Sequence, residues 1–411
     1  MPEFLNLLPP AKALNKFLDH LPITIRKENL PTSLALGRVT AEAVLALQSL
    51  PEFNRSTMDG YAVSAADTHG VSESLPVYLT LIGEVPMGGS PDFRVEKGQC
   101  ALIHTGGMLP PGADSVVMVE HTQTARSHEI EVLRSVASGE NVIEVGEDVK
   151  RGQEVISQGV KLRPAEIGGL MALGITEVVV SQRPHVGILS SGDEVIPPDQ
   201  QPSPGQVRDI NTYTLGALVE QAGAIPHKYG IIPDKREDML RTVRKAKEEC
   251  DMVIVTAGSS ASTRDLTAEV MDAQGEPGVL VHGVNVKPGK PTILAVVEDR
   301  PLIGLPGNPV SALVIAGLFV TPILRVMTGL PRNAIRPTVS AQLTLNVASK
   351  TGRENWVPVR MHLSETGNYL AEPIFGKSNL IFTLVKADGL IRIPEAVNGL
   401  NANEDVLVYL F

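Results

Sequence analysis

Apolar and polar positions follow a mixed strand and helix pattern in residues 183–329. An apolar run at residues 185–190 is followed by a helical pattern at residues 211–221 and a strand near residues 228–232. The fully apolar run at residues 252–256 is typical of a strand buried on both faces of a parallel sheet. The alternation predicts a doubly wound α/β domain.

Polar residues mark the helix starts and strand ends of this domain. Asn211 is a suitable N-cap, and Asp234 and Glu237 have capping-box spacing ahead of a charged helix that ends near residue 250. Doubly wound sheets bind ligands at the carboxyl ends of their strands. The loops predicted there contain residues 191–194, Asp234 and residues 258–260. We therefore expect a ligand site at this edge of the sheet.

Short runs of period two predict β structure in two other parts of the chain. One part is a small C-terminal β domain over residues 330–411, with runs at residues 338–347, 355–363, 389–393 and 405–410. The other is a β-rich unit at residues 49–142. Apolar and polar residues alternate there over residues 77–103, and glycines mark the turns. Helical patterns precede it at residues 10–20 and 34–47 and follow it at residues 164–173. We predict an insertion that splits a mainly helical domain made of residues 1–48 and 143–182.

Composition narrows the functional classes. With 43% hydrophobic and 20% charged residues, the chain resembles soluble globular proteins. Its net charge of −10 and the absence of a basic arm argue against a nucleic-acid partner. Residues 1–8 lack a signal peptide pattern, and the proline-punctuated run at residues 303–324 is expected to be buried rather than to span a membrane. Cys100 and Cys250 form no metal spacing and are expected in the core, so we expect a cytoplasmic protein.

The most informative local motif follows the apolar run at residues 252–256. Gly258, Ser259 and Ser260 have the residue types that offer backbone amides and hydroxyls to a phosphate ahead of a helix. Asp265 comes shortly after them and is equally well explained as the cap of a helix over residues 266–272. A catalytic role for Asp265 therefore needs partners from other segments.

Two further loops supply such partners. In the first, Lys287 and Lys290 flank a stiff turn of two prolines and Gly289, so both lysines are expected to face a common point, although most lysine pairs are solvated surface groups. In the second, Asn308 is suited to the N-cap and Pro309 to the first position of a helix. Gly307 would let a ligand approach the amides at that helix start.

Four acidic residues lie near predicted strand ends of the same domain. A Mg²⁺ site that supports phosphate chemistry needs carboxylates converging at one edge. Each residue alone is more often a cap or a surface group. Their shared edge makes them candidate metal ligands: Glu194, Asp209, Asp234 and Asp265.

At these motifs the chain resembles the MoeA family, which includes the C-terminal domain of gephyrin. The resemblance covers nearly the whole chain and rests on seven collinear motifs: Asn54 to Ala62, Thr105 to Gly107 with Leu109 to Asp114, Gly146 to Asp148, Pro164 to Glu166, Ser191 to Glu194, Lys287 to Pro291 and Leu305 to Pro309. It implies a MogA-like α/β domain, a β-rich insertion and a small C-terminal β-barrel. The chain differs by Ala257 and Ser262 at two loop glycines, and by Trp356 at an aromatic position.

The resemblance also implies a reaction. Members of the family insert molybdate into adenylylated molybdopterin and release AMP with Mg²⁺ as cofactor, and tungstate is an equally suitable oxyanion for this chain. The residues that would then hold the pterin nucleotide are Gly258, Ser259, Ser260, Lys287, Gly289, Lys290, Pro306, Gly307, Asn308, Arg353 and Ser378. Glu194, Asp234 and Asp265 would organise the metal, the oxyanion or the attacking species.

The family resemblance implies a homodimer whose cleft is shared between subunits. Asp59, Thr105 and Asp148 would come from the second subunit, with Thr105 among the residues that hold the nucleotide. A molybdopterin adenylyltransferase and acceptor molybdoenzymes would be further partners. Two alternatives stay open: the chain could itself be that adenylyltransferase, because the activity occurs on a similar α/β domain, or a non-catalytic scaffold of the gephyrin type.

Overall fold

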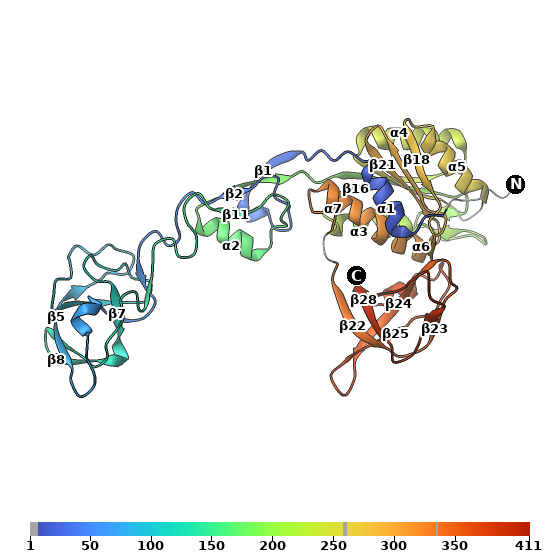
Figure 1. The fold of residues 1–411 in the computed structure, drawn as a ribbon. Helices are drawn as coiled ribbons and strands as arrows, with labels where there is room; N and C mark the ends of the chain where they lie inside the picture. Colours follow the sequence, from blue (N-terminus) through green and yellow to red (C-terminus); the bar gives the residue numbers. More distant parts are fainter. Residues whose placement is uncertain (1–6, 258–260, 334–335) are drawn as a thin grey trace.

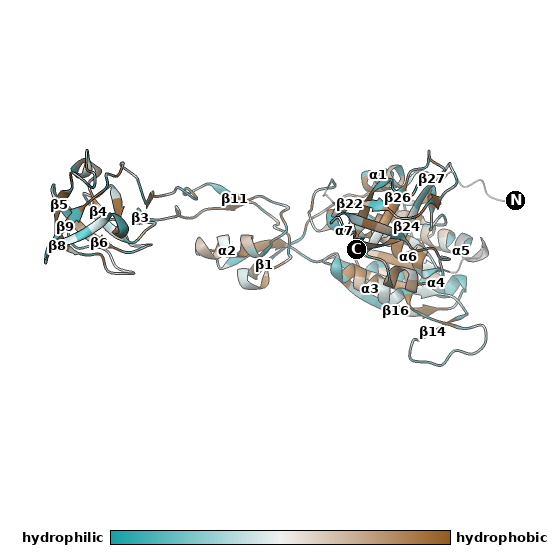
Figure 2. Cartoon of the chain, turned by 90° about the horizontal axis from the view of Figure 1, so that it is seen from below, coloured by the Kyte–Doolittle hydropathy of each residue, from teal (hydrophilic) through white to brown (hydrophobic). Residues whose placement is uncertain are grey.

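The molecule is elongated and consists of a large body joined to a small β-rich domain by a slender middle region. We describe residues 7–257, 261–333 and 336–411 of a computed structural model. In Figure 1 the body contains the α/β domain and, next to it, the C-terminal barrel, while the β-rich domain lies at the opposite end of the molecule. The perpendicular view in Figure 2 shows the same separation, with helix α2 in the region between them.

A six-stranded sheet with helices on both faces forms the centre of the body. Its strand order is β16 (Ile225–Ile232), β13 (His185–Ser191), β17 (Met252–Ala257), β21 (Arg300–Pro306), β20 (Ile293–Val297) and β18 (Pro277–His282), and the first four are parallel. One core contains side chains of α1 (Pro10–Asp19), α3 (Asn211–Gln221) and residues 310–326. The other contains side chains of α4 (Arg236–Glu249) and α5 (Ala261–Asp272). The prediction of a doubly wound domain is confirmed.

The apolar segment near residue 310 forms a buried helical run rather than an exposed one. It consists of α6 (Pro309–Ile315), a π-helical turn η4 (Ala316–Val320) and α7 (Thr321–Met327). Its length and composition would suffice to cross a membrane, but 67% of the apolar window is buried inside the protein. Phe319 and Ile323 are fully buried in the core of the α/β domain, so the run is a core helix, as the sequence predicted.

The middle region is not mainly helical, and the predicted helix at residues 34–47 is wrong. Only a 3₁₀ turn η1 (Thr32–Leu34) and the short strand β2 (Val44–Leu45) occur there. Strand β2 pairs with β11 (Glu154–Ile156), and β1 (Lys27–Pro31) pairs with β12 (Glu177–Ser181). Pairing with strands more than a hundred residues away overrides local helix propensity here. The helix predicted at residues 10–20 does form, as α1, but it packs on the α/β domain.

Helix α2 (Pro164–Ala172) is the one predicted helix that lies in the middle region. Its start is fixed by Glu166, which accepts a hydrogen bond from the backbone N–H of Arg163 at 2.8 Å and forms an ion pair with the Arg163 side chain. The hydrogen bond from the Arg163 guanidinium lowers the pKa of Glu166 from 4.5 to about 2. The negative charge also suits the positive end of the helix.

We expect Glu166→Gln to weaken α2 at neutral pH but not at strongly acid pH. Because the folded pKa lies below the usual value, the charged carboxylate contributes stability above pH 4.5 that is lost as the pH falls towards 2. The expected loss at pH 7 is about 0.5–1 kcal/mol, since one partner of the ion pair is exposed. Hydrogen exchange of the α2 amides at several pH values measures it; an equal loss at pH 7 and pH 2.5 would contradict the assignment.

The inserted β-rich domain is a single sheet with two small apolar clusters. Its strand order is β7 (Ser115–Met118), β4 (Gly60–Val63), β6 (Gln99–Ile103), β5 (Val77–Glu84), β9 (Glu129–Val132) and β8 (Thr122–Arg126). The short pair β3 (Arg55–Ser56) and β10 (Val142–Ile143) lies where the chain enters and leaves the domain. Cys100 is buried on β6, and Cys250 is buried at the end of α4, so both cysteines are core residues as predicted.

The C-terminal domain is a closed five-stranded barrel. Strands β24 (Glu354–Leu363), β25 (Tyr369–Pro373), β22 (Thr338–Leu343), β28 (Asp405–Leu410) and β26 (Gly389–Ile393) follow one another, and pairing of β24 with β26 closes the circle. Two short strands, β23 (Val347–Ala348) and β27 (Gly399–Leu400), and helix α8 (Phe382–Val385) complete it. One further strand, β19 (Val286–Lys287), comes from the α/β domain and pairs with the start of β24. This pairing joins the barrel to the α/β domain.

Candidate active site

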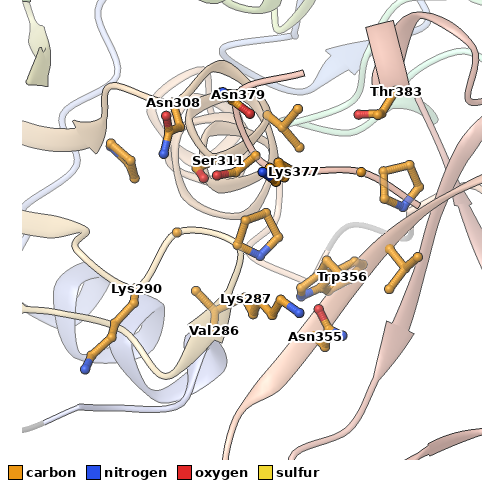
Figure 3. Close-up of a pocket in the computed structure, with 18 of the residues that line it drawn as sticks. Val286, Lys287, Lys290, Asn308, Ser311, Asn355, Trp356, Lys377, Asn379 and Thr383 are labelled. Carbon is orange, nitrogen blue, oxygen red and sulfur yellow. The ribbon is translucent and has the colours of Figure 1, made fainter. Parts of the chain in front are cut away.

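A cleft of about 840 Å³ lies between the α/β domain and the barrel. The α/β domain contributes the turn at residues 286–291 and the start of α6, and the barrel contributes residues 353–358 and 374–379. Figure 3 shows side chains from both domains facing this space. Seven residues predicted to hold a nucleotide line it: Lys287, Gly289, Lys290, Pro306, Asn308, Arg353 and Ser378.

Backbone hydrogen bonding explains why segments far apart in sequence meet here. Strand β19 is parallel to β24 and places Lys287 opposite Asn355, two residues after Arg353. On the other wall, the N–H of Val310 donates to the carbonyl oxygen of Ser378 at 3.0 Å. The lysine turn, the start of α6 and the barrel loop are therefore held together by the main chain, independently of the side chains that line the cleft.

The lining of the cleft is cationic. Lys287, Lys290, Arg353 and Lys377 border it, whereas no aspartate or glutamate among the described residues does. Within the described parts of the chain, none of these four side chains forms an ion pair. The Nε of Arg353 is buried and has no hydrogen-bond partner there, a costly state for a charged group without a ligand. In a chain of net charge −10, this concentration of positive charge indicates a site for an anion.

The two predicted lysines do not converge fully. Both line the cleft, but Figure 3 shows the Lys287 side chain extending towards Trp356 and Asn355, while the Lys290 ammonium points away from them. Gly289 sits between them with φ of 108°, a conformation that favours glycine. Its sharp turn directs the lysines differently, so Lys287 is better placed to contact a ligand against the barrel wall.

Trp356 forms a fixed part of that barrel wall. It is 5% exposed, and its indole N–H donates to the Glu354 carboxylate at 2.7 Å. The second Glu354 oxygen pairs with Arg392 at 2.7 Å, so both ends of this buried carboxylate are satisfied. Tyr409 packs edge-on against the Trp356 ring with centroids 5.0 Å apart. The wall is thus rigid, and the chain's single tryptophan lies within it.

The loop after β21 has the predicted form. Strand β21 ends at Pro306, Asn308 is the N-cap, and Pro309 is the first helical residue. The Asn308 side chain makes no capping hydrogen bond. Ser311, one turn into α6, also lines the cleft. The carbonyl of Gly307 accepts a hydrogen bond from Asn211, whose predicted role as a helix cap is wrong because α3 begins at Asn211 itself.

The acidic candidates do not line the cationic cleft. Asp209 precedes α3 and accepts a hydrogen bond from the Thr212 N–H at 3.1 Å, so it stabilises the helix start. Asp234 is not a helix cap, because α4 begins at Arg236 with Lys235 as its N-cap. Burial raises the pKa of Asp234, and the nearby charges of Asp193 and Glu194 act in the same direction. Asp193 and Glu194 therefore lie near Asp234.

Asp265 also differs from its predicted setting. Helix α5 begins at Ala261, so Asp265 lies inside the helix rather than at its cap, and its side chain is exposed. Gly258, Ser259 and Ser260 fall outside the described residues. Among the residues that are described, no three histidine, cysteine, aspartate or glutamate side chains are grouped to hold a metal ion. The convergence of four carboxylates on one metal stays a prediction.

The order of strands in the sheet decides how the acidic and the cationic groups lie relative to one another. Glu194 follows β13 and Asp234 follows β16, whereas Pro306 ends β21 and the lysine turn precedes the antiparallel neighbour β20. The parallel order β16, β13, β17, β21 therefore puts all these loops on one edge of the sheet. Carboxylates occupy the β16 and β13 end, and cations occupy the β21 end. Strand β17, which ends at Ala257, lies between β13 and β21 in this order.

The three candidates in or beside the inserted domain, Asp59, Thr105 and Asp148, lie far from the cleft within one chain. Asp59 precedes β4, and it accepts hydrogen bonds from the Thr105 N–H at 2.8 Å and the Thr105 hydroxyl at 3.1 Å. These bonds lower the pKa of Asp59. Asp148 lies where the chain returns from this domain, and its N–H donates to the Leu50 carbonyl. Figures 1 and 2 place the domain at the opposite end from the barrel.

Three family models match consecutive parts of the chain. They describe the MoeA N-terminal region (domains I and II) over residues 8–174, a probable molybdopterin binding domain over residues 187–326, and the MoeA C-terminal region (domain IV) over residues 340–411. The chain belongs to the MoeA family. The sequence resemblance to this family is confirmed, and the MogA-like α/β domain and C-terminal barrel fit it.

Relatives of this MoeA family member match it almost end to end. A putative molybdopterin biosynthesis protein of Methanocaldococcus jannaschii is 34% identical, covering 98% of both chains. A molybdopterin molybdenumtransferase of Haemophilus influenzae is 30% identical, covering 98% of this chain and 99% of the relative. A crystal structure of the molybdopterin biosynthesis MoeA protein from Pyrococcus horikoshii has a TM-score of 0.86 at 33% identity, covering 99% of this chain and all of that one.

Several polar residues of the cleft in this MoeA family member were not predicted. Lys377, Asn379 and Thr383 come from the barrel loop and the start of α8. Asn355 lies on β24, directly opposite Lys287. Lys377 and Asn379 flank the predicted Ser378, which was the available signal. Asn355 begins the alternating run at residues 355–363, but that run indicates a strand and not a ligand contact.

Proposed function

We propose that this chain is a molybdopterin molybdenumtransferase that inserts molybdate or tungstate into adenylylated molybdopterin and releases AMP. The observation that carries the proposal is the cleft in an otherwise acidic chain, which the described residues line with four cations and no carboxylate. Both substrates are anions with several oxygens, and fixed cations stabilise charge that develops on phosphate. The names of curated relatives with 30–33% identity support the same activity.

The positions of the charged loops suggest how the substrate lies. Phosphate groups would bind at the β21 end of the sheet, against Lys287 and Arg353. The carboxylates of Glu194 and Asp234 would face the neighbouring part of the same edge. Mg²⁺ is commonly held by one or two carboxylates together with substrate phosphates. Asp234 and Glu194 fit that mode because they are oxygen ligands that follow the neighbouring strands β16 and β13. The ion would neutralise phosphate charge.

Incubation with defined substrates tests the activity. Purified protein with adenylylated molybdopterin, Mg²⁺ and molybdate should release AMP and form active cofactor, and tungstate should support AMP release as well. Reactions without the oxyanion are the control. Pyrophosphate release from ATP and unmodified molybdopterin would instead indicate the adenylyltransferase. Failure to bind any pterin nucleotide would favour the scaffold.

We further propose a homodimer in which the inserted domain of one subunit completes the cleft of the other. The separation of Asp59, Thr105 and Asp148 from the cleft in one chain supports it, because the body and the inserted domain cannot meet within a subunit of this shape. Cytoplasmic location and transfer of the product to acceptor molybdoenzymes, after supply by a molybdopterin adenylyltransferase, belong to the same proposal.

Mixed dimers test the shared cleft. Asp59→Ala and Lys287→Ala are each expected to be inactive as homodimers. After the two variants are mixed and allowed to exchange subunits, we expect about one quarter of wild-type AMP release, because half of the dimers would contain one intact cleft. Mixing Lys287→Ala with Arg353→Ala is the control. Both changes lie in the body of a subunit, so every cleft of a mixed dimer keeps one of them and no activity should return. No recovery in the first mixture, with exchange verified by mass, would refute the arrangement.

A further inference from the structure

Asn211 links the start of α3 to the loop that borders the cleft. It is the first residue of the helix and is 7% exposed. Its Nδ2 donates to the carbonyl oxygen of Gly307 at 2.8 Å, across 96 positions of the sequence. Gly307 lies between Pro306 and Asn308, both of which line the cleft. The contact therefore fixes a peptide group at the cationic end of the sheet.

The other end of the Asn211 amide has no structural explanation. Its Oδ1 is buried and has no hydrogen-bond partner among the described residues. Leaving a buried acceptor unsatisfied costs free energy, and an apolar residue of similar size would avoid that cost. The stability of the fold alone thus does not explain why an asparagine occupies position 211. The hydrogen bond from its Nδ2 to Gly307 explains it if the orientation of the loop is important.

Peptide geometry gives the consequence of that bond. In a planar trans peptide the C=O and the following N–H point in opposite directions. Holding the Gly307 carbonyl towards α3 therefore turns the Asn308 N–H away from α3. That N–H donates to no acceptor in the described parts of the chain. The neighbouring Pro309 has no N–H, and the next one, of Val310, is bonded to Ser378. Asn308 thus offers a free main-chain donor in this loop, among the described residues.

We propose that Asn211 is a positioning residue that orients the Gly307–Asn308 peptide so that the Asn308 N–H binds an anionic oxygen in the cleft. The phosphate of the pterin nucleotide as the natural anion rests on the proposed function; the orienting role does not. The buried Nε of Arg353 is a second donor in the same cleft that lacks an acceptor among the described residues. Main-chain and guanidinium donors from two domains would then bind one anion.

Two variants of Asn211 test the proposal. Asn211→Asp keeps the shape but replaces the donor with an acceptor, and Asn211→Ala removes both ends of the amide. Thr214→Val is the matched control, because its hydroxyl bonds the Asn211 carbonyl within α3 and not the loop. Thermal unfolding identifies any variant that fails to fold. Binding of AMP is measured by calorimetry, and AMP release from adenylylated molybdopterin gives kcat and KM.

We expect about a tenfold loss of AMP affinity and about a 10²-fold lower kcat with little change in KM for both Asn211 variants, since one oriented donor is misplaced. Thr214→Val should stay within about twofold of wild type. Folded Asn211 variants with wild-type affinity and kcat would overturn the proposal, as would a wild-type protein that does not bind AMP. A wild-type protein that binds AMP but releases none from the substrate would refute the proposed function, while the affinity comparison would still decide the role of Asn211.

Discussion

Lys287→Ala is expected to lower the rate of AMP release by about 10²–10³-fold without unfolding the protein. The Lys287 side chain extends into the cleft towards Trp356 and Asn355, and it forms no ion pair within the described residues. Its contribution to folding is therefore small. The backbone pairing of β19 with β24 uses main-chain groups, which alanine retains. The substitution thus removes a cation and leaves the walls of the cleft in place.

Steady-state AMP release and calorimetric binding of AMP measure the effect of Lys287→Ala. Lys12→Ala is the matched control, since Lys12 is an exposed lysine on α1 of the same body. Lys290→Ala should have a smaller effect than Lys287→Ala, because the Lys290 ammonium points away from the barrel wall. Wild-type turnover by Lys287→Ala would exclude this lysine from the reaction and would weaken the assignment of the cleft.

Gly289→Ala is expected to disrupt both the fold of the turn and the activity. A Cβ at this position would lie 2.1 Å from Cγ1 of Ile315, a fully buried core residue of α6 that has no room to move. The backbone φ of 108° is a second obstacle, because side chains disfavour this conformation. Overpacking typically costs about 1–3 kcal/mol, and left-handed strain adds about 1–2 kcal/mol. The turn that carries Lys287 and Lys290 should therefore move.

Thermal unfolding and AMP release together measure the effect of Gly289→Ala. Gly205→Ala is the matched control: Gly205 has a φ of 91° in the same domain, but a Cβ added there would meet no atom within 4 Å. Gly205→Ala should lose only the stability that left-handed backbone strain costs, and it should keep wild-type activity. Equal loss of stability in the two variants would mean that Ile315 yields and that the clash is unimportant.

The α/β domain could be predicted well because its signals are local. Apolar runs mark β13 and β17, and the polar residues after β13 lie at the edge that parallel sheets use for ligands. Pro309 at the first helical position and Gly289 in a strained turn were also visible from residue type. Each of these features depends on a few neighbouring residues, so the sequence contains enough information to predict them.

The middle region and the helix starts could not be predicted in the same way. Residues 34–47 have helical spacing, but pairing of β2 with β11 decides their structure from more than a hundred residues away. Asn211 has the residue type of a cap, yet Asp209 accepts the Thr212 N–H and Asn211 instead bonds Gly307. Both outcomes depend on tertiary contacts, which cannot be inferred from the local sequence pattern.

The site was predicted as one cluster, but its charges are separated along the sheet. Strand-end loops can be assigned to one edge from sequence, whereas the order of strands along that edge cannot. That order puts Glu194 and Asp234 at one end and the turn carrying Lys287 at the other. The cations of the barrel, Arg353 and Lys377, enter through a strand pairing between domains that the sequence does not indicate.

The pairing of β19 with β24 limits what can be learned from isolated pieces of this protein. A fragment beginning near residue 336 would close its five strands but would leave Glu354 and Asn355 beside an open strand edge. Such edges attract other chains and promote aggregation. The fragment would also present Arg353 without the lysine turn that faces it. Ligand binding by the barrel alone would therefore report on a different surface from the one in the intact enzyme.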